Sequence, residues 1–255
     1  MSYKDYEPED LARADFKFHL LEGHEKNNIE IMFSGYVSEV VGRINDGKEA
    51  TVYLCKADPW VGVEYLAAKI YRARVFRAFN TDRTYRNLRK FKDRRMARHM
   101  SGSGEDGNRA FHYHWVESEW KHLNTLFDAG VAVPKPYLNS ADGILMDYFG
   151  DAEVPAHRLV HCQLDPDEWS RLLENLLEDV QLMLDENLVH GDLSAYNILY
   201  HAGEYRIIDV PQAIDTRIEP DGRMLLERDL NNLAKFFRKR DVDLDVESTL
   251  SRMWR

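Results

Sequence analysis

The spacing of apolar residues predicts β-strands in the first half of the chain and helices in the second half. Residues 36–44 alternate between apolar and polar with the period of two that is typical of a strand, and residues 50–55 resume this pattern after a turn at 45–47. A third apolar run at 65–71 is also predicted to be a strand. The sequence thus predicts a hairpin with a glycine at its tip and a third strand after it.

Amphipathic helices are predicted where apolar residues recur every three or four positions. One helix is predicted at 115–129, and its apolar face consists of Val116, Trp120, Leu123 and Phe127. Two more are predicted at 169–187 and 225–240. The charged residues 1–35 are interpreted as an N-terminal helical extension.

An apolar run at 144–150 ends at Gly150, which makes this glycine a candidate hinge between two lobes. We therefore expect an α+β fold with a strand-rich N-lobe at 36–149 and a mainly helical C-lobe at 150–255. The candidate catalytic and binding residues lie in both predicted lobes.

A short predicted hairpin in the C-lobe brings three polar side chains together. Strands are predicted at 198–200 and 205–208, and they place Asp192, Asn197 and Asp209 at one end of the hairpin. Asn197 and Asp209 offer the oxygen ligands that Mg²⁺ prefers. Asp192 is left to accept a proton from an attacking hydroxyl.

The spacing from Asp192 to Asn197 is the Asp-x-x-x-x-Asn of protein kinases, with Gly191 where those enzymes have arginine. The alternative interpretation is that an Asp and an Asn in a turn only cap the backbone. The second half of the site has to come from the N-lobe.

A lysine lies inside the apolar run at 65–71. Because a lysine is almost never fully buried without a partner, Lys69 requires an anion, and in kinases this is the α/β-phosphate of ATP together with a helix glutamate. Glu119 is the predicted partner because it lies beside the apolar face of its helix, and Glu117 is the alternative. An edge-strand lysine that points to solvent is the other interpretation.

The tip of the first hairpin is a candidate phosphate contact. A turn at Gly47 can present backbone N–H groups to phosphate, and Lys48 adds a positive charge beside it. An ordinary hairpin turn explains the same residues equally well.

The composition is that of a soluble protein. No apolar run in the 255 residues approaches the roughly 20 residues of a membrane span, and the first ten residues are acidic and polar, unlike a signal peptide. We therefore expect a cytoplasmic protein without a membrane partner. Cys55 and Cys162 lie far apart and lack the spacing of a disulfide framework or a zinc site.

Positive charge is concentrated in one segment of an otherwise acidic chain. Residues 72–98 contain eleven Arg or Lys and two Asp, a net charge of +9, whereas the whole chain carries −10. This asymmetry favours a polyanionic partner, with RNA the first candidate, and a solvated helix is the alternative. Residues 101–108 are predicted to be a loop, so that 72–112 forms a basic, flexible insert in the N-lobe.

Together these motifs resemble the RIO family of atypical serine/threonine protein kinases, and within it most the Rio-one type. The resemblance covers residues 36–240. It rests on DGKEATVY at 46–53, AAKIY at 67–71, DAGVAVPKP at 128–136, LVHGDLSAYNILY at 188–200 and IIDVPQA at 207–213. Pro211 departs from the serine that is usual in the Rio-one type.

The resemblance implies a two-lobed kinase fold without the usual activation loop. It also implies that Lys69 holds the α/β-phosphates of ATP, that Glu119 positions Lys69, and that Asp192 is the catalytic base. Asn197 and Asp209 would bind Mg²⁺, and Asp209 would itself accept the phosphoryl group in an ATPase cycle. The remaining ATP contacts that it implies are Gly47, Lys48, Glu49 and Ala50 over the phosphates, Val52 and Met146 around adenine, and the backbones of Asp147 and Phe149 at the adenine edge.

The family acts in maturation of the small ribosomal subunit, so the resemblance implies that the basic segment 72–98 binds a pre-small-subunit ribosomal particle or ribosomal RNA. Two other classes remain open. Small-molecule kinases similar to aminoglycoside or choline phosphotransferases share the His-Gly-Asp-x-x-x-x-Asn pattern, and a non-catalytic module would use ATP only to switch its conformation.

Overall fold

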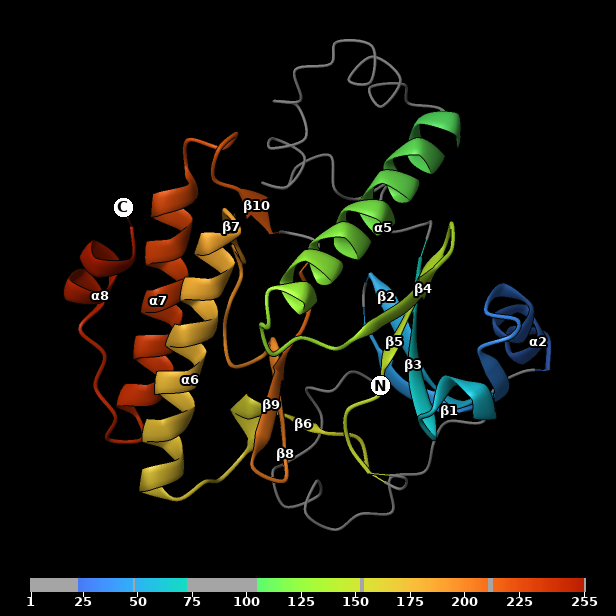
Figure 1. The fold of residues 1–255 in the computed structure, drawn as a ribbon, viewed down its shortest axis with the longest axis horizontal. Helices are drawn as coiled ribbons and strands as arrows, with labels where there is room; N and C mark the ends of the chain where they lie inside the picture. The colour runs from blue at the N-terminus through green and yellow to red at the C-terminus, as the bar shows by residue number, and fades with distance from the viewer. Residues whose placement is uncertain (1–22, 48, 73–104, 152–153, 211–212, 255) are drawn as a thin grey trace.

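The computed structural model describes residues 23–47, 49–72, 105–151, 154–210 and 213–254. Among these residues a five-stranded sheet forms one part of the molecule, and three helices with two small sheets form the other (Figure 1). The strand-rich part precedes the helical part in the chain, which confirms the predicted α+β fold. Within the same residues, no helix combines the length and the apolar composition that a bilayer crossing requires.

The large sheet is antiparallel and has the strand order β1-β2-β3-β5-β4. Its strands are β1 (Val37–Asp46), β2 (Ala50–Ala57), β3 (Tyr65–Tyr71), β4 (Pro136–Asn139) and β5 (Gly143–Asp147). Since side chains alternate between the two faces of a strand, β2, β3 and β5 each supply side chains to two different cores.

One face of the sheet packs against helix α2 (Gly23–Met32). The buried cluster on this side comprises Ile29, Phe33, Val37, Val40, Tyr53, Cys55, Leu66, Ala68 and Leu145. The opposite face packs against helix α5 (Glu105–Asp128) and continues into the core of the second half of the chain. The sheet residues on that side are Ala50, Ala67, Tyr71, Ile144 and Met146, and this is the face that carries the site.

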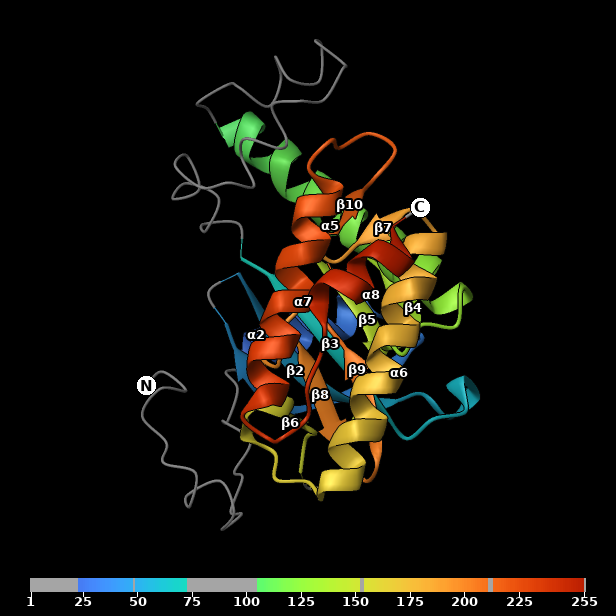
Figure 2. The same cartoon turned by 90° about the vertical axis from the view of Figure 1, so that its left-hand side faces the viewer.

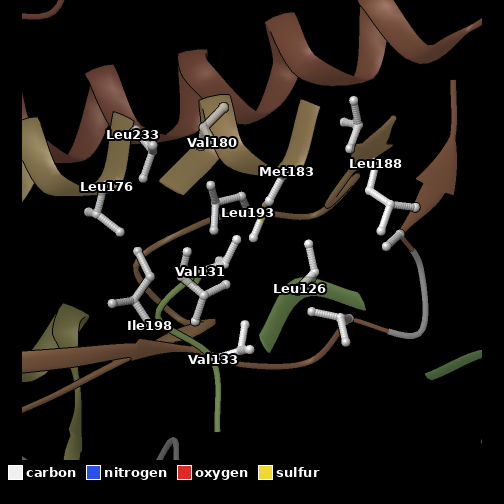
Figure 3. Packing of buried hydrophobic residues seen from close by; sticks show 14 of the residues in the cluster. Leu126, Val131, Val133, Leu176, Val180, Met183, Leu188, Leu193, Ile198 and Leu233 are labelled. Atoms are coloured by element: carbon white, nitrogen blue, oxygen red, sulfur yellow. The ribbon is translucent and has the colours of Figure 1, made fainter. Parts of the chain in front are cut away.

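The second half of the chain is built on helices α6 (Pro166–Asp185), α7 (Gly222–Arg238) and α8 (Val246–Met253). α8 packs against α7 (Figure 2). Apolar residues of α5, α6 and α7 meet the loop that follows β7, and the labelled side chains in Figure 3 are Leu126, Val131, Val133, Leu176, Val180, Met183, Leu188, Leu193, Ile198 and Leu233. The loop at 190–197 packs against this core through Leu193 and Ala195.

Short strands connect these helices. The first small sheet has the order β6-β8-β9 and the second pairs β7 with β10. Their bounds are β6 (His157–Arg158), β7 (Leu188–Val189), β8 (Ile198–His201), β9 (Glu204–Ile207) and β10 (Ile214–Asp215), and two 3₁₀ turns, η2 (Pro59–Val61) and η5 (Leu159–His161), complete the elements. The predicted hairpin of the C-lobe is therefore present as β8 and β9.

Helix α5 is longer than the sequence suggested. It begins at Glu105, so residues 105–112, which were predicted as part of the flexible insert 72–112, are helical. Glycine, aspartate and asparagine are poor helix formers, and Gly107 made this stretch look like a loop. A tertiary contact outweighs propensity here, because the buried His112 places Nε2 2.9 Å from Oδ1 of Asp142. Phe127, predicted on the apolar face, is 38% exposed near the end of the helix.

Two other predicted boundaries were wrong. Asn45 and Asp46 belong to β1, where they pair with Val52 and Thr51, so the turn lies at Gly47 rather than at 45–47. Helix α6 begins at Pro166 because Asp165 and Glu168 form a capping box. Residues 1–22 and most of the basic segment 72–98 lie outside the described residues.

Candidate functional site

Lys69 is the centre of the site. Its Nζ lies 2.7 Å from Oε1 of Glu119 on α5 and 2.8 Å from Oδ1 of Asp209, which follows β9. Lys69 and Glu119 are 9% and 2% exposed, so both charges are withdrawn from water. The predicted pairing of Lys69 with Glu119 is confirmed, and Glu117 instead accepts a hydrogen bond from Nδ2 of Asn139 at 2.7 Å.

The electrostatics of this cluster favour an ion pair between Lys69 and Asp209. Burial disfavours the charge on Lys69, but the two carboxylates outweigh it and raise the pKa of Lys69 above its ordinary value. The Lys69 ammonium in turn lowers the pKa of Asp209. Burial raises the pKa of Glu119 to about 7 against the opposing effect of Lys69. Lys69 therefore stays protonated at neutral pH.

Tyr71 is a member of the cluster that the sequence analysis missed. Its hydroxyl donates to Oε2 of Glu119, and its ring centroid lies 5.3 Å from Nζ of Lys69. The ring of His112 lies edge-on to that of Tyr71, with centroids 6.3 Å apart. The signal was available in the sequence, because residues two apart on a strand share a face.

The loop between β7 and β8 presents Asp192 and Asn197 to the same region. Asn197 donates from Nδ2 to the carbonyl of Asp192 at 2.9 Å, and its own carbonyl accepts from the N–H of Ile208 at the same distance. The Asp192 side chain is exposed. Asp209 follows with φ of 70°, a left-handed conformation that is uncommon outside glycine. The three polar residues are thus gathered at one end of the hairpin, as predicted.

His190 connects this loop to the strand before Asp209. Its Nε2 lies 3.1 Å from the carbonyl of Ile208, and its Nδ1 is 3.3 Å from the N–H of Asp192. Since Nδ1 faces a donor, it is the acceptor, and Nε2 carries the proton. Burial lowers the pKa of His190, which agrees with a neutral ring.

Asp229 on α7 is a second residue that sequence analysis missed. Its carboxylate accepts from the N–H of Gly191 at 2.7 Å and from that of Leu193 at 3.0 Å, while it is 2% exposed. Burial raises its pKa to about 7. The carboxylate therefore binds the backbone N–H groups of the residues before and after Asp192. An acid inside a predicted amphipathic helix is ordinary, so only its burial reveals this role.

The candidate adenine residues share the face of the sheet that carries Lys69. Val52 pairs with Lys69, and Met146 pairs with Ala67, two residues before the lysine. Both belong to the core on the α5 side of the sheet.

The candidate edge contacts use only part of their backbone. The Asp147 N–H donates to the Lys135 carbonyl at 2.8 Å, and the Phe149 carbonyl accepts from the Ala156 N–H at 3.0 Å. The Asp147 N–H and the Phe149 carbonyl are therefore already bonded within the chain.

Backbone hydrogen bonds hold the described residues of the hairpin tip to one another and to the residue after β3. The Gly47 N–H donates to the Ala50 carbonyl at 3.0 Å, and the Glu49 carbonyl accepts from the N–H of Arg72 at 2.9 Å. Lys48 lies outside the described residues. The candidate phosphate loop is therefore tied to the end of β3.

The donor set fits a hard divalent cation. Because Nδ2 of Asn197 is directed at the Asp192 carbonyl, its amide oxygen is the atom left to face a ligand. Asp209 uses Oδ1 for Lys69 and keeps a second carboxylate oxygen. An amide and a carboxylate oxygen are ligands that Mg²⁺ accepts. Among the described residues, no cluster of three or more His, Cys, Asp or Glu side chains forms another metal centre.

Comparison with known proteins adds the family. A family model for the RIO domain matches residues 51–249. RIO-type serine/threonine-protein kinase Rio1 from Methanocaldococcus jannaschii is 30% identical over 94% of this chain and 76% of its own length. Serine/threonine-protein kinase RIO3 from Bos taurus is 30% identical over 82% of this chain.

A solved structure shares the fold. The crystal structure of the Rio2 kinase-ADP/Mg²⁺-phosphoaspartate complex from Chaetomium thermophilum has a TM-score of 0.63 at 19% identity, and it covers 89% of this chain and 64% of that one. This chain spans about 40% of the length of RIO3 from Bos taurus and of rio1 from Schizosaccharomyces pombe. Because the family model matches most of its residues and a relative aligns over nearly its whole length, the chain belongs to the RIO domain family.

Proposed function

We propose that this chain is an ATP- and Mg²⁺-dependent phosphotransferase of the RIO type that acts as a serine/threonine protein kinase, as an ATPase, or as both. The observation that carries the proposal is the buried Lys69, held by Glu119 and Asp209 at 2.7 and 2.8 Å. A lysine fixed in this way presents a positive charge where the α/β-phosphates of ATP would lie. Membership of a family whose relatives are named serine/threonine-protein kinases supports the same activity.

In the proposed complex, adenine lies between Val52 and Met146, and the hairpin loop at 47–50 covers the phosphates. Asn197 and Asp209 would hold Mg²⁺, which supplies charge neutralisation on the phosphates when bound. Asp209 would exchange its bond to Lys69 for the cation, and Lys69 would then be available to the phosphates. The exposed Asp192 is free to accept a proton from the attacking group.

We further propose that Asp209 is the phosphoryl acceptor of an ATPase cycle. A carboxylate oxygen of Asp209 forms a bond to the γ-phosphorus while the bond to the β–γ bridging oxygen breaks, and ADP leaves with the electron pair. Water then attacks this phosphorus and its proton passes to Asp192, while the bond from phosphorus to the Asp209 oxygen breaks, so that phosphate leaves and the Asp209 carboxylate is restored. The support is the position of Asp209 beside Lys69 and the phosphoaspartate named in the Rio2 complex.

The test is incubation of the full chain with γ-labelled ATP and Mg²⁺, with Asp192→Ala and Asp209→Ala as variants. Label that requires Asp209 and is released by hydroxylamine is expected for an aspartyl-phosphate. Label that is stable to hydroxylamine and lies on serine would replace the ATPase cycle with conventional kinase chemistry. Absence of both labelling and ATP turnover would contradict the phosphotransferase proposal and favour a small-molecule kinase without its acceptor or an ATP-switched module.

The biological setting that we propose is maturation of the small ribosomal subunit in the cytoplasm. The support is the family membership and the net charge of +9 in residues 72–98, which suits ribosomal RNA or a pre-ribosomal particle. Binding to small-subunit ribosomal RNA should weaken steeply as salt rises. A variant with Arg86, Arg89 and Lys90 changed to glutamine should show a smaller salt slope, and an unchanged slope would exclude this segment as the contact.

A further inference from the structure

Helix α5 contacts the site at two points one turn apart. Glu119 binds Lys69, and three residues later His122 places its Nδ1 3.3 Å from the carbonyl of Val210. Residues three apart on a helix lie on the same side of it. The same helix therefore touches the lysine and the residue that follows Asp209.

The direction of this hydrogen bond follows from the chemistry of its partners. Burial lowers the pKa of His122, so its imidazole is neutral and carries one proton. A carbonyl oxygen can only accept, so this proton is on Nδ1. His122 is thus a donor to the Val210 carbonyl.

The carbonyls of Ile208 and Val210, the residues before and after Asp209, are both bonded to histidines. The Ile208 carbonyl accepts from His190, and the Val210 carbonyl accepts from His122. The Val210 carbonyl also accepts from the N–H of Ala213 at 3.1 Å, so His122 and Ala213 hold the same acceptor.

Asp209 needs such support because its φ is 70°. A residue other than glycine adopts this conformation only at an energetic cost, and the conformation persists when the surroundings impose it. Lys69 holds the side chain of Asp209, but the backbone depends on its neighbours.

We propose that His122 is a positioning residue that fixes the backbone of Asp209 from helix α5. Its Nδ1–H holds the Val210 carbonyl, so that Glu119 and Asp209 keep their relative positions around Lys69. The part of this inference that concerns catalysis rests on the proposed function, whereas the part that concerns the backbone does not.

The experiment compares His122→Asn with His122→Gln. Asparagine places its amide N–H close to the position of Nδ1, whereas the longer glutamine places it near the position of Nε2. Hydrogen–deuterium exchange of the peptide that spans 207–216 should be about five times faster in His122→Gln, the effect of one lost hydrogen bond, and close to wild type in His122→Asn. His114→Gln, the same change on the same helix, is the control and should leave this exchange unchanged.

The second readout is the Mg²⁺ concentration that gives half-maximal ATP turnover. It should rise about five- to tenfold in His122→Gln and stay near wild type in His122→Asn, with KM for ATP at saturating Mg²⁺ changed less. Equal exchange in the Asn and Gln variants would overturn the proposal, as would a Mg²⁺ dependence that neither variant shifts. If the wild type has no turnover, the proposed function fails, and exchange alone still decides the role of His122.

Discussion

Lys69 and Asp209 are 140 positions apart in the chain, and Nζ of the first lies 2.8 Å from Oδ1 of the second. The same ammonium group lies 2.7 Å from Glu119 on α5. One cation thus joins a strand of the large sheet, the long helix and the segment after β9. Loss of this cation should lower both the stability and the activity. The loss of stability should depend on pH.

Lys69→Met should abolish ATP turnover and destabilise the fold by about 3–5 kcal/mol at pH 8, because Glu119 is left buried without a counter-charge. Asp209 adds little to this cost, since its side chain is 45% exposed and can turn to water. Burial already raises the pKa of Glu119 to about 7, and loss of Lys69 raises it further.

The pH dependence of this variant follows from the sign of that shift. A carboxyl whose folded pKa exceeds its unfolded value stabilises the folded state at low pH, and this contribution is lost as pH rises through the folded pKa. The deficit of Lys69→Met relative to wild type should therefore be smaller at pH 5 than at pH 8 in urea unfolding. Lys69→Arg keeps the charge and should show a smaller deficit at both values. A deficit independent of pH would contradict a buried, unpaired Glu119.

Tyr71→Phe should leave Oε2 of Glu119 without its hydroxyl donor. The free energy of unfolding should fall by about 1–3 kcal/mol, the cost of a buried acceptor that loses its partner. KM for ATP should rise more than kcat falls, because Glu119 no longer holds Lys69 firmly. Tyr65→Phe on the same strand is the matched control, since Tyr65 is only partly buried, and should be near neutral. Equal effects of the two changes would show that Tyr71 acts only through packing.

Asp229→Asn should misplace the loop that carries Asp192. An asparagine presents one acceptor and one donor to the N–H groups of Gly191 and Leu193, so one of the two hydrogen bonds is lost. A cost of about 1–3 kcal/mol is expected, together with a drop in kcat of about 100-fold if Asp192 moves by roughly 1 Å. Steady-state kinetics and urea unfolding measure the two effects, and a normal kcat would exclude this role.

The same substitution should also change the pH dependence of stability. The pKa of Asp229 is raised to about 7 by burial, so its contribution to folding is present below the unfolded value near 4 and is lost as pH rises to 7. Wild type should therefore gain stability relative to Asp229→Asn as pH falls from 7 to 5. A difference that does not vary over this interval would show that Asp229 is charged throughout.

The two thiols should be slow to react in the folded protein. Burial raises the pKa of Cys55 to about 12 and that of Cys162 to about 11, and only the thiolate is the nucleophile. Iodoacetamide should modify Cys162 slowly at pH 8 and Cys55 only on unfolding, because Cys55 is fully buried. Mass spectrometry of the native and urea-unfolded protein distinguishes the two sites. Rapid labelling of Cys55 in native buffer would contradict the packing of β2.

The sequence was sufficient for the parts of the site that depend on local pattern. Lys69 inside an apolar strand and Glu119 beside the apolar face of a helix predicted their contact, because each residue is anomalous for its environment. The hairpin of β8 and β9 was predictable from its alternation and its turn. These signals lie within a few residues of the side chains concerned.

The supporting residues could not be predicted in the same way. Asp229 binds a loop 38 positions earlier at Gly191, and nothing near it in the helix sets it apart from other acids on α7. His122 likewise contacts Val210, 88 positions away. The start of α5 was missed for the related reason that a contact between His112 and Asp142 outweighs the weak local propensity of the helix. Long-range contacts decide these features.

Helix α5 has 24 residues and is therefore about 36 Å long. Glu119 and His122 lie in its second half, and in the chain it follows the basic segment 72–98. In a rigid helix of this length, a small tilt at its first residues displaces both Glu119, which binds Lys69, and His122, which binds the Val210 carbonyl. Lys69 and Asp209, the proposed phosphoryl acceptor, would then come into or out of alignment in one movement. A polyanion bound near the start of the helix would then change the rate of turnover by tilting the helix.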